Sequence, residues 1–485
     1  MAESGGRRSS RPVKLYPAIR RETHNPGRRL RPGVTVIGLD DTDSRTAGMC
    51  STYLATLLAE AIGDAGGAVK RRLLVRLDPA VEHKTRGNAA LALHADVDPE
   101  AAMTLASDLV ESFAVGSDPR TSPGVVVADC DPGEVPAPVA EFSRAAVRER
   151  RDLDAALALA ADAGFETRGW TAAGDAEGAG PTTDPPDGDG DGGAVVGRGR
   201  IGALAAVGAW RAFDDWTYER ISYREFDRCG TPREVDEAGV FAAAEEWYPR
   251  TWDTVDRGER EAVCVPSAPG PILHGIRGDD PEAVTALADD VDGEPVERSA
   301  LFVTNQGTDA HLRDGDRGDL RDGRAYRVDG TVVAAPETRR GGHVFLRIGD
   351  SGDDSDGEST LACVAFEPTK RFRDRVRALR VGDRLTVCGE VADGTVKLEK
   401  FAVRDLVGTE RVVPECPDCG RSMESAGEGQ GYRCRDCGTS EPGRVETPLD
   451  RDIAPGWYEV PPCARRHISK PLVRGGFDAP THPER

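Results

Sequence analysis

Four cysteines in two C-x-x-C pairs form the most specific chemical pattern in the sequence. Cys416 and Cys419 make the first pair, Cys434 and Cys437 make the second, and fourteen residues separate the pairs. A glycine follows each pair (CPDCG and CRDCG) and allows a tight turn that directs both thiolates towards one ion. Four thiolates at about 2.3 Å complete a tetrahedral zinc site with no open position. The spacing therefore predicts a structural zinc ribbon rather than four unrelated buried cysteines.

An acidic loop is the second candidate site. Asp40, Asp41 and Asp43 lie in the segment DDTDS, and Thr42 and Ser44 add hydroxyl groups to it. Carboxylate oxygens suit Mg²⁺ and, through it, phosphate groups. Equally acidic segments elsewhere (DGDGDGG and DSGDDSDG) leave a solvated loop as the alternative. The predicted strand before DDTDS and the predicted helix after it favour a site for Mg²⁺ and phosphate.

Two hydroxyl residues begin the helix that follows. Ser51 and Thr52 come directly after Gly48-Met49-Cys50, in a first turn where free N–H groups and the helix dipole attract phosphate. A serine at such a position is also a common N-cap. The residues alone leave both interpretations open.

Basic residues beside glycines are further candidates for phosphate binding. Lys84, Arg86 and Asn88 lie in KTRGN, after a predicted strand and a turn that contains proline. In a chain with only seven lysines, a lysine flanked by arginine and glycine favours a phosphate clamp. Gly199 and Arg200 end the segment GRGR before a helix, and this turn is a second candidate for anion binding.

The elements that must position these residues form a predicted α/β region in the first part of the chain. Hydrophobic patterns predict a strand over 34–39, a helix from about 49 to 62, strands near 69–77 and 89–97, a helix over 99–114, a strand over 125–128 and helices within 137–163. The segment 171–194 is rich in Gly, Asp and Pro and is predicted to be a loop insertion.

A second and a third region follow. A helix after GRGR, strands over 217–225, 262–266 and 297–304, and helices over 235–247 and 281–290 suggest an α+β region of ferredoxin-like type. Five short strands then occupy about 325–405, with a helical stretch over 371–379 between the third and the fourth. Five strands with a helix after the third are typical of an OB-fold β-barrel.

Length, charge and composition limit the class of protein. A chain of 485 residues is too long for one hydrophobic core. We find no apolar stretch long enough to cross a membrane and no signal peptide, and we expect a reduced, cytoplasmic protein. The net charge is −21 and only seven of the 63 basic residues are lysines, which is typical of proteins that work in molar salt.

Nine ordered segments carry a resemblance to a known family. They are GLDDTDSRTAGMCSTYLA, HKTRGNAAL, GRIGALAAVGA, PILHGIRGD, FVTNQGTDAHL, GGHVFLRI, AFEPTKRFR, CGRSMESAGEGQGYRC and PGWYEVPPCARRHISKPLVR. From about Val34 to Arg474 the chain resembles the archaeal tRNA(Ile) 2-agmatinylcytidine synthetase (TiaS) family. The resemblance implies an ATP-dependent ligase that joins agmatine to the 2-position carbon of the wobble cytidine of the isoleucine tRNA with a CAU anticodon. The tRNA then decodes AUA, and no obligate protein partner is implied.

The family implies an α/β and α+β multidomain fold. We place a disordered basic extension over 1–32, a kinase-like catalytic domain over 33–197, a ferredoxin-like domain over 198–322, an OB-fold over 323–408, a zinc ribbon over 412–440 and a C-terminal tail over 441–485. Because the family begins at the first strand, we expect that residues 1–33 are dispensable for activity.

The resemblance also implies roles for the candidate residues. Asp40, Asp41 and Asp43 would hold Mg²⁺ and the phosphates of ATP, with Lys84, Arg86 and Asn88 as phosphate contacts. The family's phosphorylated residue is a threonine, and Ser51 takes its place here. Attaching a phosphoryl group to the cytosine 2-oxo group makes it a leaving group for the attacking amine of agmatine, with release of AMP and phosphate.

Contacts to the other substrates are inferred from charge. Asp236 and Glu237 are candidates for the agmatine guanidinium, although solvated surface acids are the alternative. Candidate contacts to tRNA phosphates are Arg371, Arg373, Arg465, Arg466 and Lys470. Two other classes compete with this function: a protein that only binds nucleic acid, and a phosphotransferase that acts on a small molecule without RNA.

Overall fold

The computed structural model describes residues 34–44, 46, 48–81, 87–171, 174–175, 196–350 and 360–485, with the backbone alone at 171, 174 and 175. The predicted basic extension and most of the predicted insertion lie outside these residues. The chain divides into two compact units. Unit 1 runs to His311 and includes 467–470 and Arg485, and unit 2 comprises 312–466 and 471–484.

Unit 1 is built on one ten-stranded mixed sheet with the order β6-β5-β4-β1-β3-β2-β10-β7-β9-β8. The strands are β1 (Thr35–Asp40), β2 (Ala68–Arg76), β3 (Ala89–Asp96), β4 (Gly124–Asp129), β5 (Glu166–Thr171), β6 (Gly174–Asp175), β7 (Thr217–Arg224), β8 (Thr251–Trp252), β9 (Ile272–Gly278) and β10 (Val296–Thr304). Parallel pairing of Leu73 with Val303 and of Leu74 with Thr304 joins β2 to β10. The two regions predicted from the sequence therefore share one sheet.

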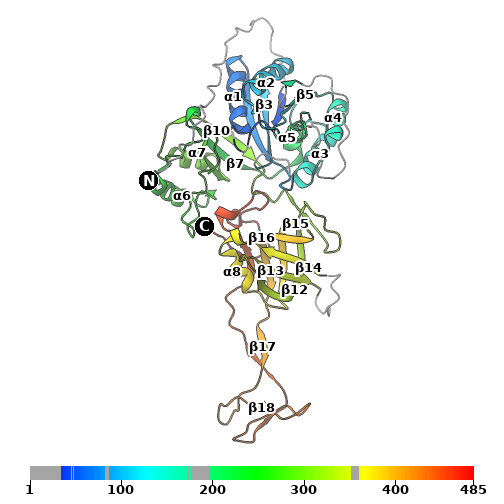
Figure 1. Ribbon diagram of the computed structural model, residues 1–485, viewed down its shortest axis with the longest axis vertical. Coiled ribbons are helices and arrows are strands. Elements are labelled where there is room, and N and C mark those ends of the chain that lie inside the picture. The colour runs from blue at the N-terminus through cyan, green and yellow to red at the C-terminus, as the bar shows by residue number, and fades with distance from the viewer. Residues whose placement is uncertain are drawn as a thin grey trace, which may run out of the picture. The chain divides into compact units, whose positions relative to one another are not determined.

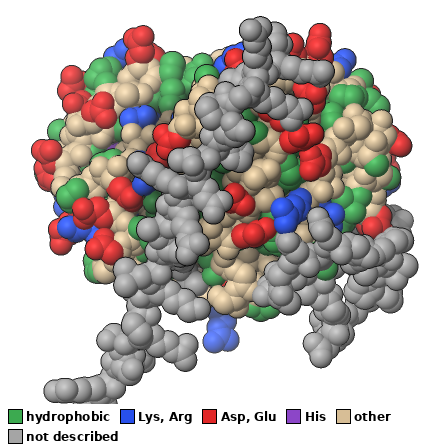
Figure 2. All heavy atoms as spheres, turned by 90° about the horizontal axis from the view of Figure 1, so that it is seen from above, with side chains coloured by type: hydrophobic (Ala, Val, Ile, Leu, Met, Phe, Trp, Pro, Cys, Tyr) green, Lys and Arg blue, Asp and Glu red, His purple; other side chains and the backbone are tan. Residues whose placement is uncertain are grey.

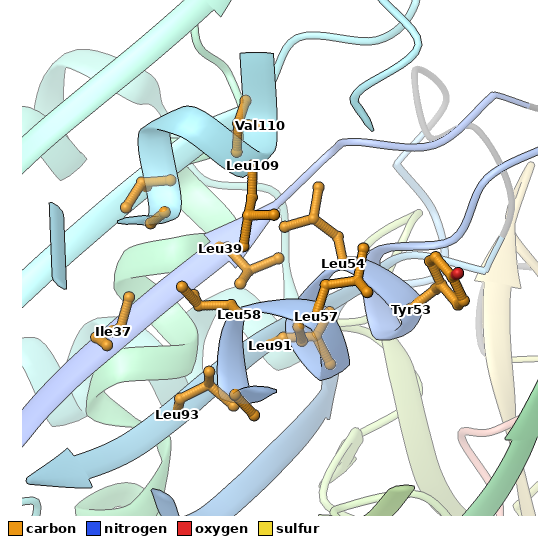
Figure 3. Packing of buried hydrophobic residues seen from close by; sticks show 14 of the residues in the cluster. Ile37, Leu39, Tyr53, Leu54, Leu57, Leu58, Leu91, Leu93, Leu109 and Val110 are labelled. Atoms are coloured by element: carbon orange, nitrogen blue, oxygen red, sulfur yellow. The ribbon is translucent and has the colours of Figure 1, made fainter. Parts of the chain in front are cut away.

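Helices cover both faces of the first half of this sheet (Figure 1). They are α1 (Ser51–Asp64) and α2 (Pro99–Phe113) on one face, and α3 (Ala137–Arg148), α4 (Leu153–Asp162) and α5 (Arg200–Ala212) on the other. Figure 3 shows Leu54 and Leu58 of α1 directed towards Leu39 of β1, within a cluster that also takes in α2. None of the helices in the described residues is long and apolar enough to cross a lipid bilayer.

Helix α5 packs on the first half of the sheet, although the sequence assigned it to the second region. Ala203 and Val207 share a buried cluster with Val36 of β1 and Val126 of β4. The close approach depends on Gly38, because a Cβ at that position would lie 2.2 Å from the carbonyl oxygen of Ala203. Glycine on a central strand thus brings the start of α5 to the end of β1.

The second half of the sheet carries α6 (Glu237–Trp247), α7 (Pro281–Asp289) and the 3-10 turn η1 (Phe226–Arg228). The strand predicted over 262–266 is wrong, because these residues form turns. Cys264 is buried in the cluster of α6 and α7, so this run is apolar because of packing and not because of strand pairing. The strand is instead β9, whose sequence ILHGIRG has low strand propensity and is held by its pairing with β7.

Unit 2 contains the five predicted strands and the predicted helix. They are β12 (Ala325–Thr338), β13 (Val344–Gly349), β14 (Leu361–Ala365), α8 (Phe372–Arg377), β15 (Arg384–Ala392) and β16 (Thr395–Asp405). The pairings run β12–β13–β14–β16–β15 and return to β12, with β14 and β16 parallel. Phe372 and Val376 of α8 pack with Phe401 of β16 in the core that these strands enclose.

The remaining elements of unit 2 are short. They are β11 (Leu312–Asp314), η2 (Glu367–Thr369), β17 (Thr409–Val412), β18 (Glu424–Ser425), β19 (Tyr432–Arg433), β20 (Ser440–Glu441), β21 (Val445–Pro448), β22 (Gly456–Glu459), η3 (Pro462–Ala464), η4 (Leu472–Arg474) and β23 (Thr481–His482). Strands β17 and β21 pair as a two-stranded ribbon, and β18, β19 and β20 form a small sheet beyond it.

Buried histidines in unit 1 give an expected dependence of stability on pH. Burial lowers the pKa of His94 to about 3 and the pKa values of His274 and His311 to about 4, and Arg71 and Arg220 add repulsion at the first two. A histidine in the unfolded chain has a pKa of about 6.5. Each histidine therefore leaves stability intact above about pH 6.5 and removes up to about 1.4 kcal/mol for each pH unit below it, until its folded pKa is reached.

We expect the melting temperature to fall between about pH 7 and pH 5, and the fall to be shallower in His274→Gln than in the natural chain. Thermal melts of both proteins at matched KCl concentration check this. Equal slopes would show that His274 is already protonated in the folded state.

Candidate active site and zinc centre

One edge of the sheet in unit 1 gathers most of the candidate residues. Strands β1 and β2 both pair antiparallel with β3, and β10 is parallel to β2, so the three strands end at the same edge. We call this edge, with Asp40, Arg76 and Thr304 at the strand ends and Ser51 and Arg200 at the starts of α1 and α5, the site edge. Loops and helix starts therefore meet there.

Asp40 and Asp41 are carboxylates held in a tight space. Oδ1 of Asp40 accepts the backbone N–H of Asp41 at 2.6 Å, and Oδ2 lies against Gly202 of α5, where a Cβ would be only 2.0 Å away. Burial, and then Asp41, raise the pKa of Asp40 well above its usual range. Burial raises the pKa of Asp41 to about 6, against the opposing effect of Arg198. Buried carboxylates of this kind gain from a bound cation.

Arg198 is a site residue that the sequence analysis did not select. Its Nη2 donates to Oδ2 of Asp41 and to the carbonyl of Arg120, each at 2.6 Å. Arg200, the predicted phosphate contact in the same GRGR segment, donates instead to the carbonyls of Gly197 at 3.0 Å and Val196 at 2.8 Å. The motif was a usable signal, but only the folded turn distinguishes its two arginines.

Ser51 faces Thr42 and does not cap the helix. The two hydroxyl oxygens are 3.0 Å apart, and both residues are buried. The N-cap position belongs to Cys50, whose side chain makes no capping hydrogen bond, so the interpretation of Ser51 as an N-cap is wrong. Gly48 and Met49 have φ values of 89° and 62°, and this left-handed turn sets the start of α1 against the acidic loop.

The other hydroxyl groups of the acidic loop and of the first turn bond within the protein. Ser44 donates to Oδ2 of Asp118 at 2.5 Å, and the Thr121 hydroxyl donates to the carbonyl of Asp43 at 2.6 Å. The Thr52 hydroxyl lies 3.0 Å from Sγ of Cys50. These bonds define the shape of the loop.

Asn88 closes the base of the loop between β2 and β3. Its side-chain amide donates to the carbonyl of Asp78 at 2.7 Å, and its own carbonyl accepts the N–H of Leu77 at 2.9 Å. Lys84 and Arg86 lie outside the described residues. Asn88 therefore positions the loop that carries them.

The candidate agmatine contacts lie at the start of α6. Asp236 is its N-cap and accepts the N–H of Ala238 at 3.1 Å, while Glu237 is exposed in the first turn. The helix packs with α7 through Val240 and Val284. The structure gives Asp236 a capping role and does not bring either acid to the site edge.

The candidate RNA contacts are largely engaged in bonds within their own unit. Arg371 forms an ion pair with Glu484, and Arg373 donates to the carbonyl of Gly342 at 2.7 Å. Arg465 pairs with buried Glu459 at 2.8 Å. Further contacts link Arg466 to Glu399 (2.5 Å) and Glu390 (2.8 Å), and the Lys470 N–H to Asp309 (2.6 Å).

The four cysteines predicted to bind zinc converge. Their Sγ atoms all lie within 4.8 Å of one another, and those of Cys419 and Cys434 are 3.7 Å apart, close to the edge of about 3.8 Å that Zn–S bonds of about 2.3 Å require. Desolvation raises the pKa of Cys416, but N–H groups of Asp418 and Cys419 outweigh it and lower the pKa to about 7. Gly420 and Gly438 follow the pairs with φ values of 68° and 73°. The predicted turns and cluster are confirmed, and the donor set fits zinc.

Three regions of the chain match domains of one protein family. Residues 36–97 match the TiaS TCKD domain, residues 197–311 the TiaS FLD domain, and residues 413–453 the TiaS C-terminal zinc ribbon domain. Two similar proteins are described as tRNA(Ile) 2-agmatinylcytidine synthetase TiaS. The one from Haloquadratum walsbyi is 54% identical over 93% of this chain and 100% of its own length. The one from Methanosarcina mazei is 44% identical over 90% and 97%.

Solved structures of similar proteins extend the match to the fold. The crystal structure of a complex of TiaS with its isoleucine tRNA and ATP has a TM-score of 0.79 at 37% identity, over 93% of this chain and 100% of the other. The crystal structure of a complex of TiaS with the same tRNA, AMPCPP and agmatine has a TM-score of 0.76 at 34% identity, with the same coverage. Both units of the chain are therefore included in the similarity.

Proposed function

The chain belongs to the TiaS family of tRNA(Ile) 2-agmatinylcytidine synthetases, and from this premise we propose how its site edge performs the reaction. The enzyme forms a C–N bond between agmatine and the wobble cytidine of the isoleucine tRNA, with ATP as the co-substrate. The placement of the Ser51 hydroxyl beside the buried carboxylates of Asp40 and Asp41 is the observation that carries the assignment of this edge as the catalytic centre.

Ser51 is the proposed phosphate acceptor or phosphate ligand. Its hydroxyl lies in the first turn of α1, where N–H groups stabilise negative charge that develops on a transferred phosphoryl group. Thr42 holds that hydroxyl from the opposite side at 3.0 Å. Phosphoryl transfer to the 2-oxo group of the cytosine makes that oxygen a leaving group, and the deprotonated amine of agmatine then attacks the same carbon.

Asp40, Asp41 and Asp43 are the proposed ligands of Mg²⁺, which neutralises phosphate charge when bound. Support comes from the raised pKa values of Asp40 and Asp41, since a carboxylate in this state gains most from a cation. Arg198 orients Asp41 through its 2.6 Å contact. Lys84 and Arg86 remain proposed phosphate contacts, with their loop held by Asn88.

Finer labels for the domains are also proposed. The circuit β12–β13–β14–β16–β15, with α8 after the third strand, supports the assignment of an OB-fold. The first half of the unit 1 sheet is the proposed kinase-like part and the second half the ferredoxin-like part, with the borders given by the sequence. We also propose a cytoplasmic location, where tRNA and ATP are available.

An assay of agmatine transfer tests this function directly. The purified chain, with zinc, is incubated with the CAU-anticodon isoleucine tRNA, Mg-ATP and labelled agmatine, and label in the tRNA is measured. A protein that only binds nucleic acid would bind tRNA and leave ATP intact. A phosphotransferase for small molecules would consume ATP equally well without tRNA.

Loss of one zinc ligand should weaken tRNA binding but not ATP binding. Structural zinc supplies folding free energy to a small ribbon, and Cys434 is a buried member of the cluster. We expect Cys434→Ser to lower the zinc content and the affinity for tRNA, while an ATP analogue still binds unit 1. Metal analysis and binding titrations check this, and full modification of tRNA by zinc-free protein would contradict it.

Salt should raise activity instead of suppressing it. Acidic side chains outnumber basic ones on the face seen in Figure 2, and the net charge is −21. Salt weakens phosphate contacts through counterion release, but it also screens the repulsion between tRNA and the acidic surface. We expect activity to increase with KCl into the molar range, and a maximum below about 0.2 M would contradict the inferred adaptation to salt.

A further inference from the structure

Arg76, the last residue of β2, is clamped by the two residues that follow β10. The side-chain oxygen of Asn305 accepts the backbone N–H of Arg76 at 2.7 Å, and the amide of Asn305 donates to the Arg76 carbonyl at 3.0 Å. Oε1 of Gln306 accepts from Nε of Arg76 at 2.9 Å. Because a guanidinium group is planar and carries its remaining donors on the two Nη atoms, this clamp sets the direction in which those donors point.

Glu219 of β7 links Arg76 to a second arginine. Its Oε2 lies 3.5 Å from Nη2 of Arg76, and its Oε1 accepts from Nε of Arg277 at 3.2 Å. The Glu219 side chain is 5% exposed, whereas those of Arg76 and Arg277 are 17% and 23% exposed. Two guanidinium groups thus share one carboxylate, and both remain accessible from solvent.

A purely structural ion pair in the same unit looks different. Arg224 and Glu294 are matched one to one at 2.5 Å, with side chains 1% and 0% exposed. The Arg76 cluster instead has an excess of positive charge and an open side. Such an excess suits an anion with two oxygens for a planar guanidinium group, and phosphate groups have this geometry.

The cluster lies at the site edge. Only β3 separates β1 from β2, so about 10 Å, or two strand spacings, lies between the ends that carry Asp40 and Arg76. Burial lowers the pKa of Arg76, and Glu219 and Cys50, the residue before Ser51, act against that shift. A Cβ at Gly87 would lie 3.4 Å from Nη1 of Arg76. Arg76 therefore lies between the start of α1 and the loop that Asn88 closes.

We propose that Arg76 and Arg277, oriented by Asn305, Gln306 and Glu219, form a second phosphate-binding position at the site edge, occupied by a phosphate group of a substrate. The proposal rests on the proposed function, since that reaction brings two phosphate sources to this edge: the ATP phosphates and the backbone of the tRNA. Arg76 and Arg277 supply the donors, and Gln306 and Glu219 position them.

Binding measurements on the full chain, with zinc and at one fixed KCl concentration, test the proposal. Arg76→Gln removes the charge, Arg76→Lys keeps the charge but loses the planar fork, and Gln306→Ala removes only the contact to Nε. Arg72→Gln is the matched control, because Arg72 lies four residues earlier on the same strand and face. Each variant is titrated with a non-hydrolysable ATP analogue without tRNA, and with the isoleucine tRNA without nucleotide.

We expect Arg76→Gln to raise one of the two Kd values at least tenfold, Arg76→Lys and Gln306→Ala to raise it at least threefold, and Arg72→Gln to change neither more than twofold. A rise for the ATP analogue alone assigns the position to the nucleotide, and a rise for tRNA alone assigns it to the RNA backbone. If Arg76→Gln does not fold, Gln306→Ala decides. Values within twofold of the natural chain for every folded variant would overturn the proposal.

Agmatine transfer by the natural chain is measured in parallel. Failure of that transfer contradicts the proposed function, while the two titrations still report whether Arg76 binds phosphate. The two conclusions therefore fail separately.

Discussion

Replacing Ser51 by alanine is expected to lower agmatine transfer at least about 10²-fold, the lower range for the loss of a group that acts in the transition state. The hydroxyl lies at the first residue of α1 and 3.0 Å from the Thr42 hydroxyl, so no neighbouring oxygen occupies the same position. Transfer to tRNA and the melting temperature should be measured on the same preparation. The melting temperature should fall only by the equivalent of about 1 kcal/mol, because one buried hydrogen bond is lost.

Ser51→Thr is the matched control, since it restores the family's residue and keeps the hydroxyl. We expect it to retain or increase transfer, because the added methyl group restricts the side chain to fewer rotamers. If Ser51 served only to satisfy the buried Thr42 hydroxyl, Ser51→Ala would lose stability and keep nearly normal turnover. Normal turnover of Ser51→Ala would remove Ser51 from the mechanism.

Gly202→Ala is expected to reduce activity to a similar extent without touching a titratable group. A Cβ at Gly202 would lie 2.0 Å from Oδ2 of Asp40 and 3.1 Å from a methyl group of Leu77, so the carboxylate must move. Displacement of a catalytic group by about 1 Å can cost about 10²-fold in rate. Transfer assays on Gly202→Ala measure this, and the melting temperature shows whether α5 still packs.

Gly63→Ala provides the control for a glycine-to-alanine change in a helix. Gly63 lies in α1, and a Cβ added there would meet no other atom within 4 Å. Alanine there should stabilise the helix by up to about 1 kcal/mol and leave transfer unchanged. Full activity of Gly202→Ala would show that Asp40 can take another position without loss, and the proposed role of its carboxylate would then be wrong.

Local patterns in the sequence were sufficient for some parts of this protein. The zinc cluster was predictable because Cys416 and Cys419 lie on one turn, and the glycine after each pair marks the φ near +70° that the turn requires. The acidic loop was predictable because an apolar strand and a helix flank it. The strands and the helix of unit 2 followed from hydrophobic alternation and from the turns between them.

Tertiary structure alone decided the features that depend on pairing between distant segments. Pairing of β2 with β10, more than 200 residues apart, joins the two predicted regions into one sheet and brings Gln306 to Arg76. Packing of α5 on Gly38 selects Arg198 rather than Arg200 as the partner of Asp41. Propensity and spacing describe interactions over a few residues, whereas these contacts depend on which strand ends meet at one edge.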